Sequence, residues 1–245
     1  MAALPEAGGQ LPGTGLPSGG AVSVPPVWLP RLQPVLTRPA TTWPGFLAAN
    51  DQPITPAPGG GERRWSAVLA LFSADDDPSL VFTVRAPHLS HHPGQISFPG
   101  GGREPVDANP TATALREAAE EVGLDAATAH IVGQLSDEHQ PYALPVSQNW
   151  VVPMVAWDDS VAGLRVCDQE EVASLRYWRI SELSDPANRV MAEHPRGPAG
   201  PAWQFGDDFL WGFTARLVDM LLRLGEWERP WDTTHLVPVP PSFRR

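Results

Sequence analysis

The chain has 245 residues, of which 42 % are hydrophobic, so it suits one domain with extensions or at most two small domains. Its formal net charge of −11 argues against nonspecific nucleic-acid binding through a basic surface. The single cysteine, Cys167, excludes an intramolecular disulfide and is typical of a reducing, cytoplasmic protein. The sequence shows neither a secretory signal pattern nor a run of about 18 apolar residues, so no membrane association is expected.

The composition of the first third of the chain changes from that of a disordered tail to that of a folded domain. Residues 1–27 are rich in Gly, Pro and Ala and are predicted to form a disordered tail. Residues 28–62 keep many prolines but add large apolar side chains, which predicts an arm packed irregularly on the domain. Apolar runs at 66–72 and 80–84, separated by a Ser-Ala-Asp-Asp-Asp-Pro turn, predict a β-hairpin.

The rest of the chain alternates between strand and helix patterns. A polar segment at 137–148 is predicted to be a loop over the active site, and 229–245 a Pro-rich C-terminal tail. The folded domain is therefore expected to span 63–228. The predicted helices are 111–122 and 210–224, and the predicted later strands are 129–135, 150–157 and 171–179.

Three carboxylates share one face of the helix predicted at 111–122. Glu117, Glu120 and Glu121 stand at positions i, i+3 and i+4, whereas the opposite face is apolar and suited to packing on a sheet. An exposed, solvated acidic face is the alternative interpretation. Carboxylates packed together repel one another unless a cation lies between them, and oxygen ligands favour Mg²⁺ or Mn²⁺.

The order of residues around this helix resembles the Nudix box, Gly-x5-Glu-x7-Arg-Glu-apolar-x-Glu-Glu-x-Gly-apolar. The match runs from Gly101 through 116–124, and it has two departures. Asp107 stands in place of the first Glu, and eight residues instead of seven separate it from Arg116, which leaves the role of Asp107 open. The resemblance implies an α/β fold, the Nudix-type α/β/α sandwich with a mixed sheet.

The segment before the box resembles the coenzyme A pyrophosphatase branch of that family. Residues 81–86 lead, through the spacings of the branch motif, to Gly94 and then to Phe-Pro-Gly-Gly at 98–101. Ser90 stands where the motif has its second Arg. The segment 210–215, Leu-Trp-Gly-Phe-Thr-Ala, also looks like this branch. The whole resemblance covers about 64–225.

The resemblance implies a metal-dependent hydrolase that cleaves a diphosphate bond, with coenzyme A or a derivative as substrate and 3′,5′-ADP and a 4′-phosphopantetheine product. Alternative substrates are ADP-ribose, dinucleotides and nucleoside triphosphates. A second function class is a Nudix-fold module that binds a ligand without turnover. The implied partner is a small molecule with a nucleoside diphosphate linkage, and the oligomeric state is left open. Glu117, Glu120 and Glu121 are the candidate ligands of Mg²⁺ or Mn²⁺.

Candidate catalytic residues are Glu120 on the helix and Glu171, an acid just before a strand that can equally be a surface residue. Arg116 has two interpretations: it orients a box carboxylate, which we favour, or it meets a substrate phosphate directly. His88, His91 and His92 lie in one loop, but they lack the spacing of a zinc site. The candidate substrate-binding residues are Arg85, Gly100, Gly101, Arg103 and Arg116.

Overall fold

The computed structural model describes residues 23–36, 65–135, 142–143, 150–195 and 197–243. Most of the predicted tail at 1–27 and of the predicted loop at 137–148 lies outside these ranges. The helices are α1 (Leu29–Leu36), α2 (Pro110–Val122), α3 (Ile180–Leu183) and α4 (Gly212–Leu224), with 3₁₀ turns at Val161–Gly163, Pro186–Asn188 and Pro241–Phe243. The strands are β1 (Trp65–Ser73), β2 (Ser79–Arg85), β3 (Ile96–Ser97), β4 (Gly100–Gly102), β5 (His130–Gln134), β6 (Tyr142–Ala143), β7 (Trp150–Asp158), β8 (Val172–Arg179), β9 (Arg189–His194), β10 (Gly197–Phe205), β11 (Asp208–Leu210) and β12 (Leu236–Pro238).

The main sheet is mixed and is organised around β1. β1 pairs in parallel with β7 along its whole length, and β5 runs antiparallel on the far side of β7. β1 and β2 form the predicted hairpin, with Phe72 opposite Leu80 at the turn. The opposite end of β1 pairs with β4, so a glycine-rich strand lies directly beside Ser66–Val68. β2 continues the sheet through β8 and β3.

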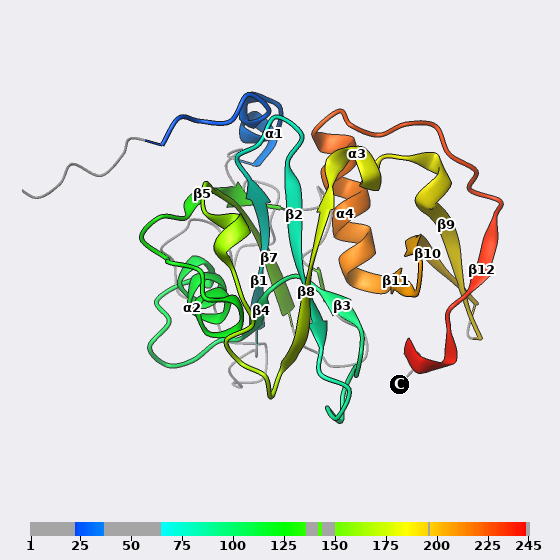
Figure 1. Cartoon of the computed structure of the whole chain (residues 1–245), viewed down its shortest axis with the longest axis horizontal. Helices are drawn as coiled ribbons and strands as arrows, with labels where there is room; N and C mark the ends of the chain where they lie inside the picture. Colours follow the sequence, from blue (N-terminus) through cyan, green and yellow to red (C-terminus); the bar gives the residue numbers. More distant parts are fainter. Residues whose placement is uncertain (1–22, 37–64, 136–141, 144–149, 196, 244–245) are drawn as a thin grey trace, which may run out of the picture.

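Both faces of this sheet are buried, because β1 alternates its side chains between two cores. Leu69 and Leu71 pack with Ala114 and Ala118 of α2 on one face. On the other face, Phe72 belongs to a core built with α1, α3 and α4. Figure 1 shows the helices on the two sides of the sheet. This arrangement confirms the predicted α/β/α sandwich.

The N-terminal arm differs from the irregular packing predicted for it. Residues 29–36 form α1, and Leu32 and Leu36 are buried against the core. Trp28 is also buried, with its ring 4.8 Å from that of Phe72. Pro34 lies inside this short helix, and a proline there normally counts against helix. Burial of one apolar stripe outweighs that local preference.

A second sheet, in the order β11-β10-β9-β12, was not predicted from the sequence. β10 contains Gly197, Pro198, Gly200 and Pro201, residue types that are uncommon in strands, but only residues 203–205 of this strand pair with β11. The prolines therefore lie where one edge of the strand has no partner in the described part of the chain. The segment 229–245, predicted as a tail, supplies β12 parallel to β9. None of the described helices has the length and apolar content of a membrane span.

Replacing Leu32 with Ala is expected to lower the free energy of unfolding by about 2–5 kcal/mol, because a fully buried side chain would leave a cavity between α1 and the core. Chemical denaturation with urea measures this change. Arg31→Ala, on the exposed face of the same helix, is the control and should change stability by less than about 0.5 kcal/mol. Equal effects for the two variants would show that α1 does not contribute to the core.

Candidate active site

Local interactions fix the start and the end of α2. The Asn109 side chain accepts a hydrogen bond from the Ala112 N–H at 2.9 Å, and Pro110 occupies the first turn, as is common at helix N-termini. The helix ends at Gly123, whose N–H donates to the Ala119 carbonyl. These bounds agree with the prediction to within one residue. They fix the direction in which the carboxylates of the helix project.

Glu121 is the buried member of the carboxylate set, with 4 % of its surface exposed. Its Oε2 accepts a hydrogen bond from the Gly100 N–H at 3.0 Å. The pKa of Glu121 is raised to about 8, mainly by burial and also by the charges of Glu117 and Glu171, although the Gly100 N–H and Arg85 act in the opposite direction. A buried carboxylate beside two other acids is a place where a cation would relieve repulsion.

Gly100 and Gly101 are required by the packing of β4 between β1 and α2. Gly100 has a φ of 153°, and a Cβ there would lie 2.3 Å from the Ala67 carbonyl oxygen. A Cβ on Gly101 would lie 2.5 Å from Oε1 of Glu117. The two glycines therefore let the strand approach the carboxylates. The expected contact of these glycines with substrate stays a prediction.

Arg116 is held by carboxylates on several sides. Its Nη2 donates to Asp107 at 3.0 Å, to Glu117 at 3.0 Å and to the Gly102 carbonyl at 2.8 Å. Its Nη1 donates to Glu120 at 2.9 Å. The hydrogen bond with Asp107 is the main cause of a raised pKa of Arg116. These contacts favour the orienting role of Arg116 over direct contact with a substrate phosphate.

Asp107 anchors this arginine, a role that the sequence left open. The carboxylate is 3 % exposed and accepts hydrogen bonds from the Glu104 N–H at 2.8 Å and from the Thr113 hydroxyl at 2.9 Å. Burial opposes its ionisation, but the bonds from Arg116, Glu104 and Thr113 outweigh burial and lower the pKa of Asp107. The extra loop residue before Arg116 therefore does not prevent the acid from reaching the helix.

Asp107→Asn is expected to reduce the free energy of unfolding by about 1–3 kcal/mol, because Arg116 would lose its most buried charged partner. Urea denaturation at neutral pH measures the loss. The control is Glu104→Gln, because its exposed carboxylate lies 3.9 Å from Arg116 and should contribute less than about 0.5 kcal/mol. If Asp107→Asn were as stable as the parent, Asp107 would not be the anchor of Arg116.

The pairing of β2 with β8 places Glu171 and Arg85 near the residues of the Nudix box. Arg85, at the end of β2, pairs with Val172, and the Ala86 N–H donates to the Glu171 carbonyl at 2.8 Å. The charge of Glu171 raises the pKa values of both Glu117 and Glu121. The predicted base and the first arginine of the branch motif therefore lie near the carboxylate helix.

Comparison with known proteins assigns this chain to a family. The family model described as NUDIX domain matches residues 62–196. The chain belongs to the Nudix hydrolase family. It is 34 % identical over 165 residues to a Yersinia pestis (strain Pestoides F) protein named "Uncharacterized Nudix hydrolase NudL", and the match covers 64 % of this chain and 77 % of that protein.

Solved Nudix structures show more distant likeness. The M. smegmatis Nudix hydrolase RenU is 21 % identical, with a TM-score of 0.36 over 47 % of this chain and 70 % of that chain. The NUDIX domain of Shewanella oneidensis NrtR, solved with ADP ribose, is 13 % identical, with a TM-score of 0.42 over 66 % of this chain and 87 % of that chain.

Divalent metals are general in the Nudix family, and the donor chemistry of the box fits a hard cation. Glu121 has a buried carboxylate, and Glu117 and Glu171 add negative charge around it. Glu120 instead reaches Arg116, with 56 % of its side chain exposed. Within the described ranges no three His, Cys, Asp or Glu side chains are already gathered as a metal site.

The structure gives local contacts for the remaining predicted residues. Arg103 is exposed, and its guanidinium lies 5.7 Å from the centre of the Trp65 ring. In the histidine loop, His88 lies 3.5 Å from Glu170, and burial together with Arg85 lowers the pKa of His92. The roles of these residues in substrate binding stay predictions.

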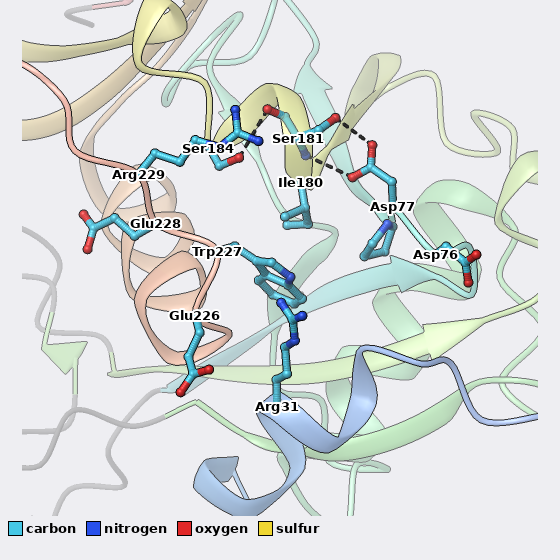
Figure 2. A pocket seen from close by; sticks show the side chains of 11 residues that line it. Arg31, Asp76, Asp77, Ile180, Ser181, Ser184, Glu226, Trp227, Glu228 and Arg229 are labelled. Carbon is cyan, nitrogen blue, oxygen red and sulfur yellow. Dashed lines mark hydrogen bonds between the residues drawn. The ribbon is translucent and has the colours of Figure 1, made fainter.

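A cavity of about 430 Å³ lies elsewhere on the molecule, and Figure 2 shows its lining. Its walls come from Arg31 of α1, the 76–78 turn, α3 and the segment 226–229. Asp77 there is bound to the Ser181 hydroxyl at 2.6 Å and to its N–H at 3.0 Å. None of the Nudix box residues lines this cavity, so its size does not make it the active site.

Proposed function

We propose that this Nudix hydrolase cleaves the diphosphate bond of coenzyme A or a derivative with the aid of Mg²⁺ or Mn²⁺. The observation that carries the proposal is the buried carboxylate of Glu121 on the Gly100 N–H, with Glu117, Glu171 and Arg85 close enough to change its pKa. Three carboxylates and the guanidinium of Arg85 lie near the glycine strand β4. This set of charges is suited to bind a phosphate group through metal ions. The reaction is attack of water on phosphorus.

Glu117 and Glu121 would hold the metal, with Glu120 as a further ligand once its carboxylate leaves Arg116. A bound metal ion supplies positive charge that offsets the charge developing on the diphosphate and acidifies bound water. Arg116, held by Asp107, fixes the position of Glu117. Glu171 is exposed on the rim and is the proposed base that accepts a proton from the attacking water.

Arg85 supports coenzyme A as the substrate. Its Nε is buried and has no hydrogen-bond partner among the described residues, although Arg85 as a whole is only partly buried. An arginine that keeps a donor unused is suited to bind an anion. Exposed Ser90 replaces the second arginine of the motif, so ADP-ribose, which lacks a 3′-phosphate, is the alternative substrate.

A substrate panel tests this proposal. Coenzyme A, dephospho-coenzyme A, ADP-ribose, a dinucleotide and a nucleoside triphosphate are incubated with the enzyme and Mg²⁺ or Mn²⁺, and the products are separated by chromatography. Coenzyme A should give 3′,5′-ADP and 4′-phosphopantetheine with the highest kcat/KM of the panel. A kcat/KM for ADP-ribose or a dinucleotide at least about tenfold higher would overturn the assignment of substrate. No turnover of any member would favour the binding module.

A further inference from the structure

We propose that the C-terminal turn Pro241–Phe243 positions the loop that directly follows Arg85, so this turn helps to bind substrate. This inference rests on the proposed function, because it gives Arg85 a role in binding the substrate. Figure 1 shows the turn Pro241–Phe243, drawn in red, at the lower side of the view, where the loop that follows β2 also lies. The described part of the turn ends at Phe243, far from Arg85 in sequence. The contacts between the two segments form a continuous chain.

The first link is the base of the loop at 86–94. The Arg85 N–H donates to the Gln95 carbonyl at 2.9 Å, and the Gly94 N–H donates to the Arg85 carbonyl at 3.1 Å. The Gln95 N–H also donates to the His92 carbonyl at 3.2 Å. The backbone of Arg85 is therefore fixed by residues at the other end of its own loop. Movement of Gln95 would disturb the hydrogen bond that holds the Arg85 N–H.

The second link joins this base to the C-terminal turn. The Gln95 side chain donates from Nε2 to the Phe243 carbonyl at 3.0 Å, across 148 residues of sequence. The Phe243 ring also faces Gly94, because a Cβ built there would lie 4.0 Å from Cε1 of the ring. One hydrogen bond and one neighbouring aromatic ring of the turn thus lie against the base of the loop.

The third link anchors the turn to the second sheet. Phe243 packs on the core of that sheet, which includes Val190, Phe209 and fully buried Val239. The Val239 N–H donates to the Glu193 carbonyl at 2.9 Å, and β12 pairs in parallel with β9. A turn attached to a packed sheet can restrain a surface loop, because the sheet opens less often than the loop would alone. The second sheet would thereby support the active site.

The first residue of the loop at 86–94 also contacts Glu171. Ala86 follows Arg85, and its N–H holds the Glu171 carbonyl at 2.8 Å. We assign the turn a positioning role only, since none of its residues belongs to the carboxylate set.

Three variants test the inference: a chain that ends at residue 240, Gln95→Leu, and a control chain that ends at residue 244. The first two remove the contact and the control keeps it. Hydrogen exchange of the Arg85, Gly94 and Gln95 amides should become at least about tenfold faster in the first two. The KM for coenzyme A should rise about tenfold while kcat stays within about threefold.

Two results would overturn the positioning role. One is amide exchange within about twofold of the control, and the other is faster exchange of these amides with no change in the KM for coenzyme A. If the shortened chain does not fold, Gln95→Leu decides, because it changes one partly buried side chain. If the parent enzyme does not cleave coenzyme A, the proposed function fails. The exchange result still decides whether the turn holds the loop, so the two failures are distinguishable.

Discussion

Glu121→Gln is expected to lower kcat/KM by about a thousandfold, which corresponds to ~4 kcal/mol of lost transition-state stabilisation. Gln keeps the volume and can still accept the Gly100 N–H, but it cannot supply the charge that a divalent cation needs. Thermal stability should not fall. Gln removes the cost of burying a charge at this position and the repulsion from Glu117 and Glu171, so the metal-free variant should melt at the same or a higher temperature than the parent.

Steady-state kinetics with the best substrate of the panel, together with a thermal melt, measure both effects. Glu193→Gln, an exposed acid on β9, is the matched control and should retain the kcat/KM of the parent. Glu120→Gln should be milder than Glu121→Gln, because the Glu120 carboxylate is largely exposed and bound to Arg116. A kcat/KM for Glu121→Gln within about threefold of the parent would contradict the assignment of the site.

Removal of divalent metal is expected to abolish hydrolysis. The box offers carboxylates, which bind Mg²⁺ and Mn²⁺, and the described part of the chain shows no gathered set of His and Cys ligands. Dialysis against EDTA followed by addition of metal measures the effect: activity should disappear and return with Mg²⁺ or Mn²⁺. Full activity after exhaustive chelation would show that the carboxylates act without a metal.

Short-range patterns in the sequence predicted the part of the site that lies on α2. Glu117 and Glu121 share a helix face because their spacing is four residues, and Gly123 ends the helix. The helix places both carboxylates against β4, and the glycines of β4 allow that approach. The shared face and the end of the helix depend on residues that are close in sequence, so the sequence alone predicts them.

Other parts depend on contacts between distant segments and were less predictable. Asp107 reaches Arg116 and Thr113 through a loop, and only the fold shows that the loop length permits it. The second sheet was missed because Gly and Pro dominate β10. The helix at 29–36 was missed because local preference opposed it, whereas burial against the core favoured it. Tertiary packing outweighed local pattern in each case.

The most direct test of the carboxylate site is a titration with Mn²⁺ followed by electron paramagnetic resonance, which reports free Mn²⁺. The parent protein should bind Mn²⁺ in competition with Mg²⁺, and the double variant Glu117→Gln, Glu121→Gln should bind it at least about tenfold more weakly. The Glu193→Gln control should bind Mn²⁺ like the parent. Equal affinity of the parent and the double variant would contradict the claim that Glu117 and Glu121 hold the metal.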